Sequence, residues 1–316
     1  MDILKERIVF MGTPSFAAHV LEGLINEGYN IVLVVSQKDK EVGRKRILSP
    51  SPVKEMALKY NLPVFTPEKI RNDYEEILKY EPSLIITSAY GQIIPKALLD
   101  YPKYKCINTH ASLLPKYRGG APIQWAIRNG EEKTGMSIMY MNEKMDEGDI
   151  LYQKELEIDI NDTNKLLFDK LSDLALEMLL ELLPKLFNND LHPIIQDHSL
   201  ATYAYNLKKE DEFINFNRKT IEVYNHIRSL LDNPGAYSIL EGKKYKWLKV
   251  SYELNDNCNP NIFKGLEKDY LRIDCLDGFI KIYELKPEGK NVMDAKSFYN
   301  GQGRNLINKK FIEELC

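Results

Sequence analysis

The chain has 316 residues, 44% of them hydrophobic and 28% charged, and a formal net charge of -3. This length predicts about two domains with ordinary hydrophobic cores, and the slightly negative charge argues against a generally basic nucleic-acid-binding protein. No apolar run approaches the ~20 residues of a membrane-spanning helix. The four cysteines lie far apart, which predicts reduced thiols and a cytoplasmic location. Without a CxxC or HExxH motif, no metal site is expected.

The N-terminal segment predicts a strand, a helix and a second strand. Residues 7–12 form an apolar run that ends at Gly12, and residues 31–36 form another. Between them, Thr13 and Pro14 are typical of an N-cap and the first residue of a helix. This strand–helix–strand order implies a parallel sheet. The first turn lacks the G-x-G-x-x-G pattern of dinucleotide-binding proteins, which disfavours a nicotinamide-dependent oxidoreductase.

A basic, polar segment follows the second strand. Residues 38–54 hold six basic and two acidic residues. The segment is longer than the ~2–6 residues of an ordinary connection between a strand and a helix, so we expect a long loop with a function of its own. Its basic core, Arg44, Lys45 and Arg46, is suited to contact phosphates. On pattern alone, a solvated run of charges is the favoured alternative.

Apolar runs and helical patterns continue to alternate as far as residue 187. Strands are expected over residues 83–89, 105–108, 134–141 and 150–158, and helices over residues 51–60, 66–79, 95–99, 122–128 and 163–187. Ser51 and Pro52 are typical of the N-cap and first residue of the first of these helices. This alternation predicts an α/β domain built on a mostly parallel sheet. The polar residues 188–206 then predict a linker.

The C-terminal part of the chain predicts a second, smaller domain. A helix is expected over residues 220–231, and short strands over residues 237–240, 245–252, 270–275 and 278–285, which is the pattern of a small β-barrel with one helix. Residues 243–249 mix lysines with aromatic residues, as in a nucleic-acid-binding strand or, equally, an exposed edge strand. The predicted division is a first domain over residues 1–187, a linker over residues 188–206 and a second domain over residues 207–316.

Residues 106–122 change character abruptly and contain the candidate active site. They begin as an apolar strand, after which Asn108 and His110 alternate with small residues. In an extended chain both side chains leave the same face. At the carboxyl edge of an open α/β sheet they would line the crevice in which ligands usually bind.

Asn108, His110 and Asp146 are the candidate catalytic residues. An imidazole titrates near neutral pH and transfers protons, an amide donates to a developing oxyanion, and a carboxylate orients the imidazole. This set suits the transfer of an acyl group between two nitrogens, with the substrate's own amine as nucleophile. On pattern alone, a hydrogen-bonded structural histidine and a turn-forming aspartate are the alternatives. The other histidines show no partner pattern and are expected to be structural or surface residues: His19, His192, His198 and His226.

The motif N-T-H-A-S-L-L-P at residues 108–115, with K-Y-R-G-G-A-P after it, resembles the signature of the folate-dependent formyltransferases. Further matching stretches run from the first strand into the second domain, at residues 10–17, 48–54, 145–149 and 233–237. Departures from the pattern are mild, among them Gly120 where alanine is usual and Lys116 where arginine is frequent. The resemblance therefore covers nearly the whole chain.

The resemblance implies a Rossmann-like first domain, with helices on both faces of its mostly parallel sheet, and a smaller C-terminal OB-like β-barrel that contacts tRNA. It implies transfer of a formyl group from 10-formyltetrahydrofolate, a co-substrate, to the α-amine of methionine on initiator tRNA. Motif matching gives the expected catalytic residues as Asn108, His110 and Asp146, the folate-binding residues as Ser112, Leu113, Leu114 and Pro115, and the tRNA-binding residues as Arg44, Lys45 and Arg46. We expect a cytoplasmic monomer that acts away from membranes and without a metal.

Other functions stay open at this point. The same chemistry suits a formyltetrahydrofolate hydrolase, or a formyltransferase that acts on a sugar nucleotide or on glycinamide ribonucleotide. The basic segment and the second domain favour tRNA over these. A non-catalytic RNA-binding protein is the alternative from a different class, and the intact set of Asn108, His110 and Asp146 speaks against it.

Overall fold

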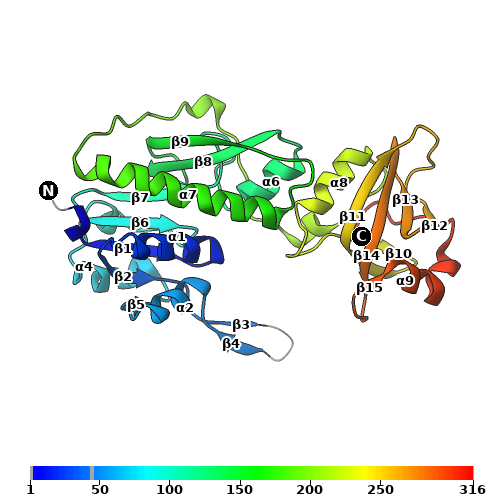
Figure 1. Cartoon of the computed structure of the whole chain (residues 1–316), viewed down its shortest axis with the longest axis horizontal. Coiled ribbons are helices and arrows are strands. Elements are labelled where there is room, and N and C mark those ends of the chain that lie inside the picture. Colours follow the sequence, from blue (N-terminus) through cyan, green and yellow to red (C-terminus); the bar gives the residue numbers. More distant parts are fainter. Residues whose placement is uncertain (1–2, 43–45, 316) are drawn as a thin grey trace. The chain divides into compact units, whose positions relative to one another are not determined.

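The architecture is that of a computed structural model, which describes residues 3–42 and 46–315. These residues form two compact units (Figure 1). The first unit takes in the segments Met1–Pro122, Lys133–Glu157 and Phe168–Tyr205, and the second takes in Ile123–Glu132, Ile158–Leu167 and Asn206–Cys316. Each unit is built from more than one stretch of chain, and the domain boundaries expected from the sequence stay a prediction.

A seven-stranded sheet forms the centre of the first unit, with the strand order β5, β2, β1, β6, β7, β8, β9. The strands are β1 (Ile8–Gly12), β2 (Ile31–Val35), β5 (Val64–Phe65), β6 (Leu84–Ser88), β7 (Cys106–His110), β8 (Lys133–Tyr140) and β9 (Ile150–Glu157). From β5 to β7 in this order the strands pair in parallel, whereas β8 and β9 are antiparallel. The predicted α/β fold with a mostly parallel sheet is confirmed.

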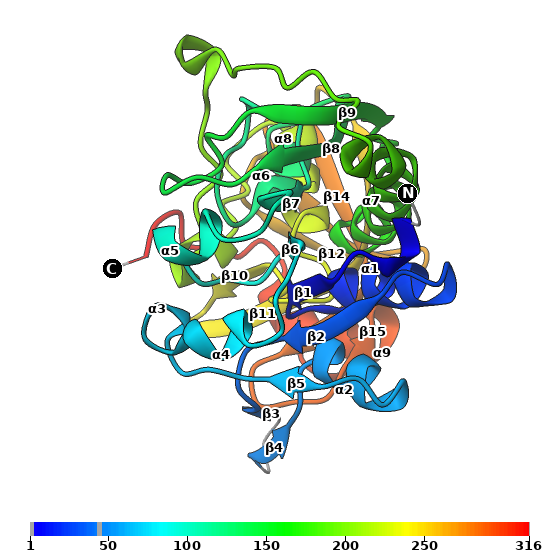
Figure 2. The ribbon, with the colours of Figure 1, turned by 90° about the vertical axis from the view of Figure 1, so that its left-hand side faces the viewer.

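Helices cover both faces of this sheet (Figure 2). They are α1 (Ser15–Asn26), α2 (Pro52–Lys59), α3 (Ile70–Asp73), α4 (Glu75–Leu78), α5 (Lys96–Leu99) and α7 (Asn164–Phe187), with one-turn helices at Ile3–Lys5 and His198–Leu200. Successive strand residues point to opposite faces, so Val9 packs with Ile70 and Ile77 of α3 and α4. On the other face α1 meets α7, where the rings of Phe16 and Phe168 pack edge to face with centroids 5.4 Å apart.

The two predicted helix starts differ in outcome. Ser51 caps α2 as predicted, because its Oγ accepts a hydrogen bond from the Lys54 N–H at 3.1 Å. In α1 the N-cap is Pro14 and not Thr13, so that prediction was wrong by one residue. The Thr13 hydroxyl instead donates to the Tyr90 carbonyl at 3.0 Å, a long-range contact that the local sequence does not reveal.

The single helix predicted over residues 66–79 is two short helices, α3 and α4. The first begins at Ile70, whose N–H donates to the side-chain oxygen of Gln92 at 2.8 Å. Tyr74 ends α3 and precedes α4. A distant side chain therefore caps the first amide of α3, and the residues before it stay outside the helix.

The basic segment is a β-hairpin and not the long loop that the sequence predicted. Its strands are β3 (Lys40–Val42) and β4 (Ile47–Ser49), which pair antiparallel. The Lys54 ammonium group anchors the base of the hairpin through an ion pair with Asp39 at 2.7 Å. The prediction failed because three-residue strands within a run of charges are too short to show a clear alternation.

The second unit is an antiparallel β domain with helices packed against it. Its elements are α6 (Pro122–Arg128), α8 (Thr220–Arg228), β10 (Tyr237–Leu240), β11 (Lys243–Leu254), β12 (Phe263–Glu267), β13 (Tyr270–Asp274), β14 (Gly278–Pro287), β15 (Met293–Asp294) and α9 (Ala295–Gly301), with one-turn helices at Lys209–Glu212 and Gly303–Leu306. The sheet order is β10, β11, β14, β13, β12, and β15 also pairs with β14. Trp247, Phe263 and Phe298 lie in its core. The predicted small β domain is confirmed, but the one predicted helix, α8, is joined by α9, which the sequence did not predict.

Strand β11 sorts its lysines and aromatic residues onto opposite faces. Tyr245 and Trp247 are buried in the core, whereas Lys244 and Lys246 are only half-buried. The strand lies between β10 and β14, so the edge-strand interpretation was wrong. Because the two rings are inside the unit, they do not form a surface on which bases stack.

Candidate active site

Strand β7 presents Asn108 and His110 at its carboxyl end. It pairs in parallel with β6, so that Asn108 lies opposite Thr87. The Thr87 hydroxyl donates to Oδ1 of Asn108 at 2.8 Å. Since the amide oxygen is engaged in this way, the NH2 group is the part of Asn108 that remains to donate to a ligand.

His110 is 5% exposed, and a backbone carbonyl holds its ring. Nε2 lies 2.9 Å from the carbonyl oxygen of Tyr117. A carbonyl only accepts hydrogen bonds, so Nε2 carries the ring proton and Nδ1 of the neutral ring carries the lone pair. Nδ1 is therefore the nitrogen of the neutral His110 ring that can accept a hydrogen bond.

Asp146 reaches the site from the turn between β8 and β9. Its Oδ2 lies 3.7 Å from Nδ1 of His110 and accepts a hydrogen bond from the Gly119 N–H at 2.8 Å. A lone pair and a carboxylate thus face one another, which is favourable when a proton or a ligand N–H lies between them. The closer contact to the ring is the carbonyl of Tyr117, so the carboxylate is not alone in orienting it. The structure brings the three candidate residues to one sheet edge, and their roles stay a prediction.

The loops that reach the site contain strained backbone. Tyr117 and Asp146 have φ angles of 59° and 54°. A non-glycine residue in this left-handed region costs on the order of 1–3 kcal/mol. Gly119 has a φ of 119°, and a Cβ there would lie 2.6 Å from the Ala204 carbonyl oxygen, so the close approach requires glycine. Such strain persists only where surrounding contacts hold it in place.

The amide of Gln196 holds the Asp146 turn from behind. Its Nε2 donates to the carbonyls of Asp146 at 2.9 Å and Gly148 at 2.7 Å. Its Oε1 accepts from Nη2 of Arg118 at 2.7 Å. Gln196 is 4% exposed, so these protein groups take the place of water. This one side chain therefore ties the Asp146 turn to the loop that follows β7.

Arg118 completes the buried network. Its Nη1 lies 3.3 Å from Oε1 of Glu147, and its Nη2 lies 2.9 Å from Nδ1 of His198. A buried guanidinium group needs such partners, because an uncompensated buried charge is strongly destabilising. The sequence assigned no role to Arg118 or Gln196. Gln196 stands in the segment expected to be a linker, where a single polar residue gives no periodic signal.

Residues 188–206 lie along the loop that follows β7. Tyr203 forms a bridge with Arg118, and the Tyr117 N–H donates to the Thr202 hydroxyl at 2.9 Å. The Ala204 N–H donates to the Arg118 carbonyl at 2.7 Å. As far as Tyr205, these residues are part of the first unit and support its active-site loop.

Residues 112–115 are the predicted folate-binding segment. The Ser112 side chain is buried and its Oγ donates to the Lys116 carbonyl at 2.7 Å. Leu114 is buried too, whereas the other two residues of the segment are half-buried. A ligand would therefore meet the backbone of this segment or its half-buried side chains, and the folate-binding role stays a prediction.

Of the three predicted tRNA-binding residues, Arg44 and Lys45 lie outside the described residues. Arg46 follows them, and its side chain is 81% exposed. Its Nε lies 3.7 Å from Oε2 of Glu41. Such an exposed ion pair contributes little to stability, so it does not prevent Arg46 from binding a phosphate.

The thiol at the start of the site motif is inert. Cys106 is buried, and its Sγ lies 3.5 Å from the Leu98 carbonyl oxygen. Burial raises the pKa of the Cys106 thiol well above its usual range. A thiolate nucleophile is therefore disfavoured here, which agrees with a reaction in which the substrate amine attacks.

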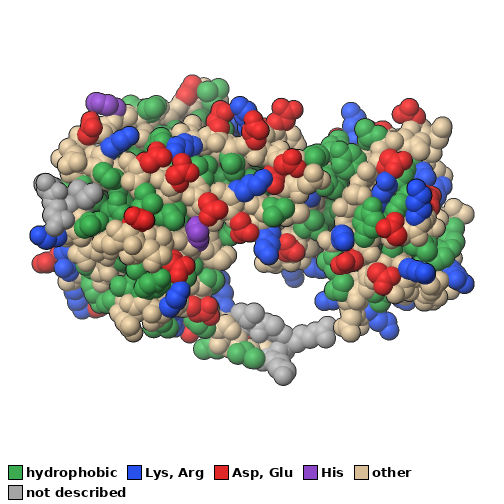
Figure 3. All heavy atoms as spheres, viewed as in Figure 1, with side chains coloured by type: hydrophobic (Ala, Val, Ile, Leu, Met, Phe, Trp, Pro, Cys, Tyr) green, Lys and Arg blue, Asp and Glu red, His purple; other side chains and the backbone are tan. Residues whose placement is uncertain are grey.

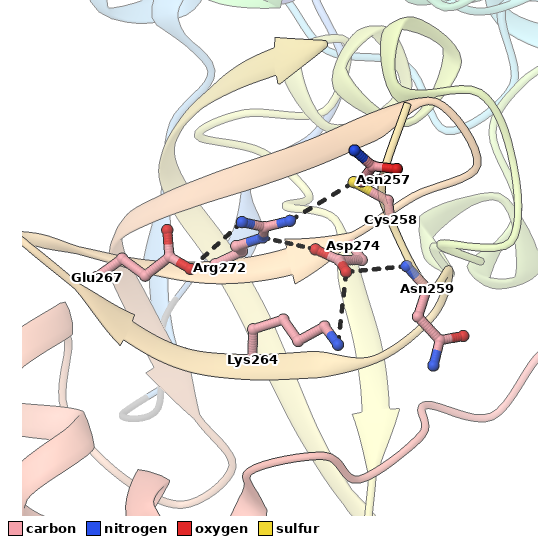
Figure 4. A pocket seen from close by; sticks show the side chains of 7 residues that line it. All are labelled: Asn257, Cys258, Asn259, Lys264, Glu267, Arg272 and Asp274. Atoms are coloured by element: carbon pink, nitrogen blue, oxygen red, sulfur yellow. Dashed lines mark hydrogen bonds and ion pairs between the residues drawn. The ribbon is translucent and has the colours of Figure 1, made fainter. Parts of the chain in front are cut away.

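A hollow of about 630 Å³ lies in the second unit (Figure 4). It is lined by Asn257, Cys258, Asn259, Lys264, Glu267, Arg272 and Asp274. The buried Asp274 carboxylate accepts from Nε of Arg272 at 2.7 Å, and the Lys264 ammonium group lies 3.7 Å away. Arg272 also pairs with Glu267 at 3.3 Å. These charges neutralise one another, which is typical of a structural ion-pair cluster.

Three further features of the described residues concern surface charge, metal ligands and membrane-spanning helices. On the face shown in Figure 3, basic and acidic side chains of the described residues are interspersed and not gathered by sign. Within residues 3–42 and 46–315, no group of three or more His, Cys, Asp or Glu is placed to hold a metal ion. Over the same residues, none of the helices combines the length and the apolar character required to cross a membrane.

The fold and the site together define the class of the protein. Asn108 and His110 lie at the carboxyl end of β7 in an α/β sheet, and the Asp146 carboxylate lies 3.7 Å from His110. The chain also contains a small antiparallel β unit. Residues 6–183 match the family model for formyl transferase, and residues 206–303 match the model for the formyl transferase C-terminal domain. The chain belongs to the formyl transferase family, which confirms the resemblance seen in the sequence.

Within this family, the chain is similar in sequence to methionyl-tRNA formyltransferases. The chain is 48% identical to a methionyl-tRNA formyltransferase of Bacillus cytotoxicus over 299 residues, which cover 93% of this chain and 95% of the relative. It is 44% identical to a methionyl-tRNA formyltransferase of Ligilactobacillus salivarius, with 97% and 98% of the two chains covered.

Solved structures share the fold at lower identity. An N-formyltransferase from Helicobacter canadensis, in complex with folinic acid and dTDP-3-aminofucose, aligns with a TM-score of 0.68 at 22% identity and covers 88% of this chain and 98% of its own. HypX from Aquifex aeolicus, in complex with tetrahydrofolic acid, aligns with a TM-score of 0.67 at 18% identity and covers 95% of this chain and 48% of its own. At these identities the likeness concerns the fold alone.

Proposed function

We propose that this protein transfers the formyl group of 10-formyltetrahydrofolate to the α-amine of methionine carried by initiator tRNA, for the initiation of protein synthesis. The observation that carries the proposal is the 48% identity, over 95% of the relative's length, to a methionyl-tRNA formyltransferase. The geometry of Asn108, His110 and Asp146 supports it, because these groups suit acyl transfer between nitrogens.

The reaction begins when the neutral amine of methionine attacks the formyl carbon. A new C–N bond forms, and the formyl oxygen becomes an oxyanion to which the NH2 group of Asn108 donates. The amine loses a proton to Nδ1 of His110, where the Asp146 carboxylate stabilises the resulting imidazolium. The bond between the formyl carbon and the folate nitrogen then breaks, and that nitrogen takes up the proton. The products are formyl-methionyl-tRNA and tetrahydrofolate.

The remaining contacts follow from the same proposal. Residues 112–115 bind the folate, and the basic residues Arg44, Lys45 and Arg46 bind the acceptor end of the tRNA, where phosphate contacts supply affinity. The second unit contributes further tRNA contacts. The protein works in the cytoplasm as a monomer and needs no metal, because the substrate amine is itself the nucleophile.

The test is incubation of the protein with 10-formyltetrahydrofolate and either methionyl initiator tRNA or the same tRNA uncharged. Formyl-methionine should appear with the charged tRNA alone. Release of formate at equal rates with and without charged tRNA would point to a hydrolase. Formyl transfer to an amino sugar nucleotide in preference to methionyl-tRNA would also contradict the proposal.

A further inference from the structure

Residues 203–205 are fixed beside the active-site loop by main-chain contacts. Tyr203 forms a parallel bridge with Arg118, and the Ala204 N–H donates to the Arg118 carbonyl at 2.7 Å. Gly119, whose N–H binds the catalytic carboxylate, comes so close to this segment that a Cβ would lie 2.6 Å from the Ala204 carbonyl oxygen. Residues 203–205 therefore lie directly against the loop that contains Gly119, the residue whose N–H binds the Asp146 carboxylate.

The side chains of Tyr203 and Tyr205 form a stacked pair on the surface. Their ring centroids are 5.7 Å apart and their planes differ by 6°. Residues two apart in an extended segment leave it on the same face, and Ala204 between them is fully buried. Tyr203 is 50% exposed and Tyr205 is 66% exposed. The segment thus turns its small residue inward and its two rings outward.

Such a pair offers a flat surface to a planar ligand. Aromatic rings carry large apolar faces whose exposure to water is unfavourable. Stacking on each other covers only part of those faces, and the exposed fractions of both side chains show that the rest is accessible. Parallel rings in a fixed orientation are the arrangement on which successive nucleic-acid bases stack, without regard to sequence.

We propose that Tyr203 and Tyr205 form a stacking platform for the unpaired bases at the 3′ end of methionyl-tRNA. This inference rests on the proposed function, because that reaction requires the methionine amine to reach His110 and Asp146. The methionine is esterified to the terminal nucleotide, so the unpaired nucleotides behind it must pass close to the loop that holds Asp146. The platform lies along that loop and presents the chemistry that single-stranded bases bind.

Three variants test the platform: Tyr203→Leu, Tyr205→Leu and the double variant. Each single change should raise the KM for methionyl-tRNA roughly tenfold, because stacking on an aromatic ring contributes substantially to the binding of each base. Tyr203→Phe and Tyr205→Phe keep the ring and should behave like the wild type. Tyr101→Leu removes another exposed tyrosine of the first unit and serves as the matched control. The KM for 10-formyltetrahydrofolate should not rise in any of them.

Affinities of two proteins for intact and truncated tRNA show whether an affinity loss comes from base stacking or from another cause. The affinity of the wild type and of the double leucine variant is measured for intact initiator tRNA and for the same tRNA without its unpaired 3′ nucleotides. The variant should bind intact tRNA more weakly and truncated tRNA as well as the wild type does. Equal losses for both RNAs, or no loss for either, would overturn the platform, and so would a higher KM for the folate in place of the tRNA. Failure of the wild type to formylate methionyl-tRNA would instead overturn the proposed function.

Discussion

Two buried histidines, one in each unit, make the same hydrogen bond. Nε2 of His110 lies 2.9 Å from the Tyr117 carbonyl oxygen, and Nε2 of His226 lies 2.7 Å from the Asp211 carbonyl oxygen. Because a carbonyl accepts, both rings carry their proton on Nε2 in the neutral form. Burial and hydrogen bonding alone therefore do not distinguish the two residues.

The groups around the two rings differ. Nδ1 of His110 lies 3.7 Å from Oδ2 of the Asp146 carboxylate. His226 lies near the Arg128 guanidinium, and burial together with this charge lowers the pKa of His226 to about 3. In the proposed mechanism the first histidine takes up a proton during the reaction, whereas the second is expected to stay neutral as part of the structure. At His226, burial and the Arg128 guanidinium together outweigh the opposing charge of Asp211.

The largest effect is expected from His110→Ala. It removes the proton acceptor beside the substrate amine, and single-turnover formylation should slow by about two to three orders of magnitude, the range seen when one catalytic hydrogen-bonding group is lost. The affinity for tRNA should barely change. His192→Ala, at an exposed position, is the control. Near-normal single-turnover rates in the His110 variant would remove this residue from the mechanism.

A stability measurement against pH tests the structural histidine. The folded-state pKa of His226, about 3, lies below its unfolded value of 6.5, so the unfolded chain takes up a proton first as the pH falls. The stabilisation is complete above pH 6.5 and is lost towards pH 3, by at most about 1.36 kcal/mol for each pH unit. His226→Gln should therefore reduce the difference in stability between pH 7 and pH 5 by about 2 kcal/mol.

Urea unfolding followed by tryptophan fluorescence is suited to this comparison. Both tryptophans, Trp125 and Trp247, belong to the second unit, which also contains His226. The control is His19→Gln, which removes an exposed histidine from the first unit. If the His226 variant kept the full pH dependence of the wild type, proton uptake at this ring would not be the cause.

Gln196→Met tests whether the position of the Asp146 carboxylate depends on the hydrogen bonds that the Gln196 amide donates to its turn. The change keeps the volume but removes the donors to the carbonyls of Asp146 and Gly148. A small displacement of a catalytic group is costly, and we expect kcat to fall roughly tenfold with little change in the KM for tRNA. The matched control is Gln153→Met, whose amide holds the Leu114 carbonyl instead.

The two variants should affect different kinetic parameters. Loss of the Gln153 amide should act mainly on the KM for the folate, since it supports residues 112–115. Loss of the Gln196 amide should also weaken the pH dependence of kcat, because His110 would lose its fixed carboxylate. A fall in thermal stability with kcat and its pH profile unchanged would show that Gln196 is structural only.

The two site residues on β7 could be predicted from the sequence, because neighbouring residues of one strand determine which face each side chain leaves. An apolar strand that ends in alternating Asn108 and His110 puts both side chains on one face, and β7 shows this arrangement. Asp146 comes from a distant turn, and the sequence offered it as a candidate beside the alternative of a turn-forming aspartate, without showing that it reaches His110. Its supports, Gly119 and Gln196, were out of reach because they depend on how residues 188–206 pack against the loop after β7.

The same distinction explains the errors in secondary structure. Ser51 was predicted correctly as an N-cap because its partner, the Lys54 N–H, is three residues away. Thr13 was not, because its hydroxyl bonds to Tyr90. Local sequence therefore predicts an element well where its hydrogen bonds are local, and poorly where a distant residue supplies the partner.

The smallest effect is expected from Arg46→Ala, which should change the binding of tRNA and leave the surroundings of both histidines as they are. If Arg46 binds one phosphate, its loss should reduce the slope of log Kd against log salt concentration by ~0.9, because fewer counterions are released on binding. The kcat at saturating tRNA should stay at the wild-type value. Glu41→Gln is the matched control, because it removes the carboxylate that lies 3.7 Å from Arg46 and leaves the guanidinium in place.

Glu41→Gln should keep the wild-type dependence of log Kd on log salt concentration or make it steeper, because the Glu41 carboxylate then no longer competes with the phosphate for Arg46. An unchanged slope in Arg46→Ala would remove this residue from the tRNA interface. A fall in kcat instead would mean that the hairpin acts on the reaction itself. That result would contradict the proposed division of roles, in which His110 and Asp146 transfer the proton and the basic hairpin contributes only to the binding of tRNA.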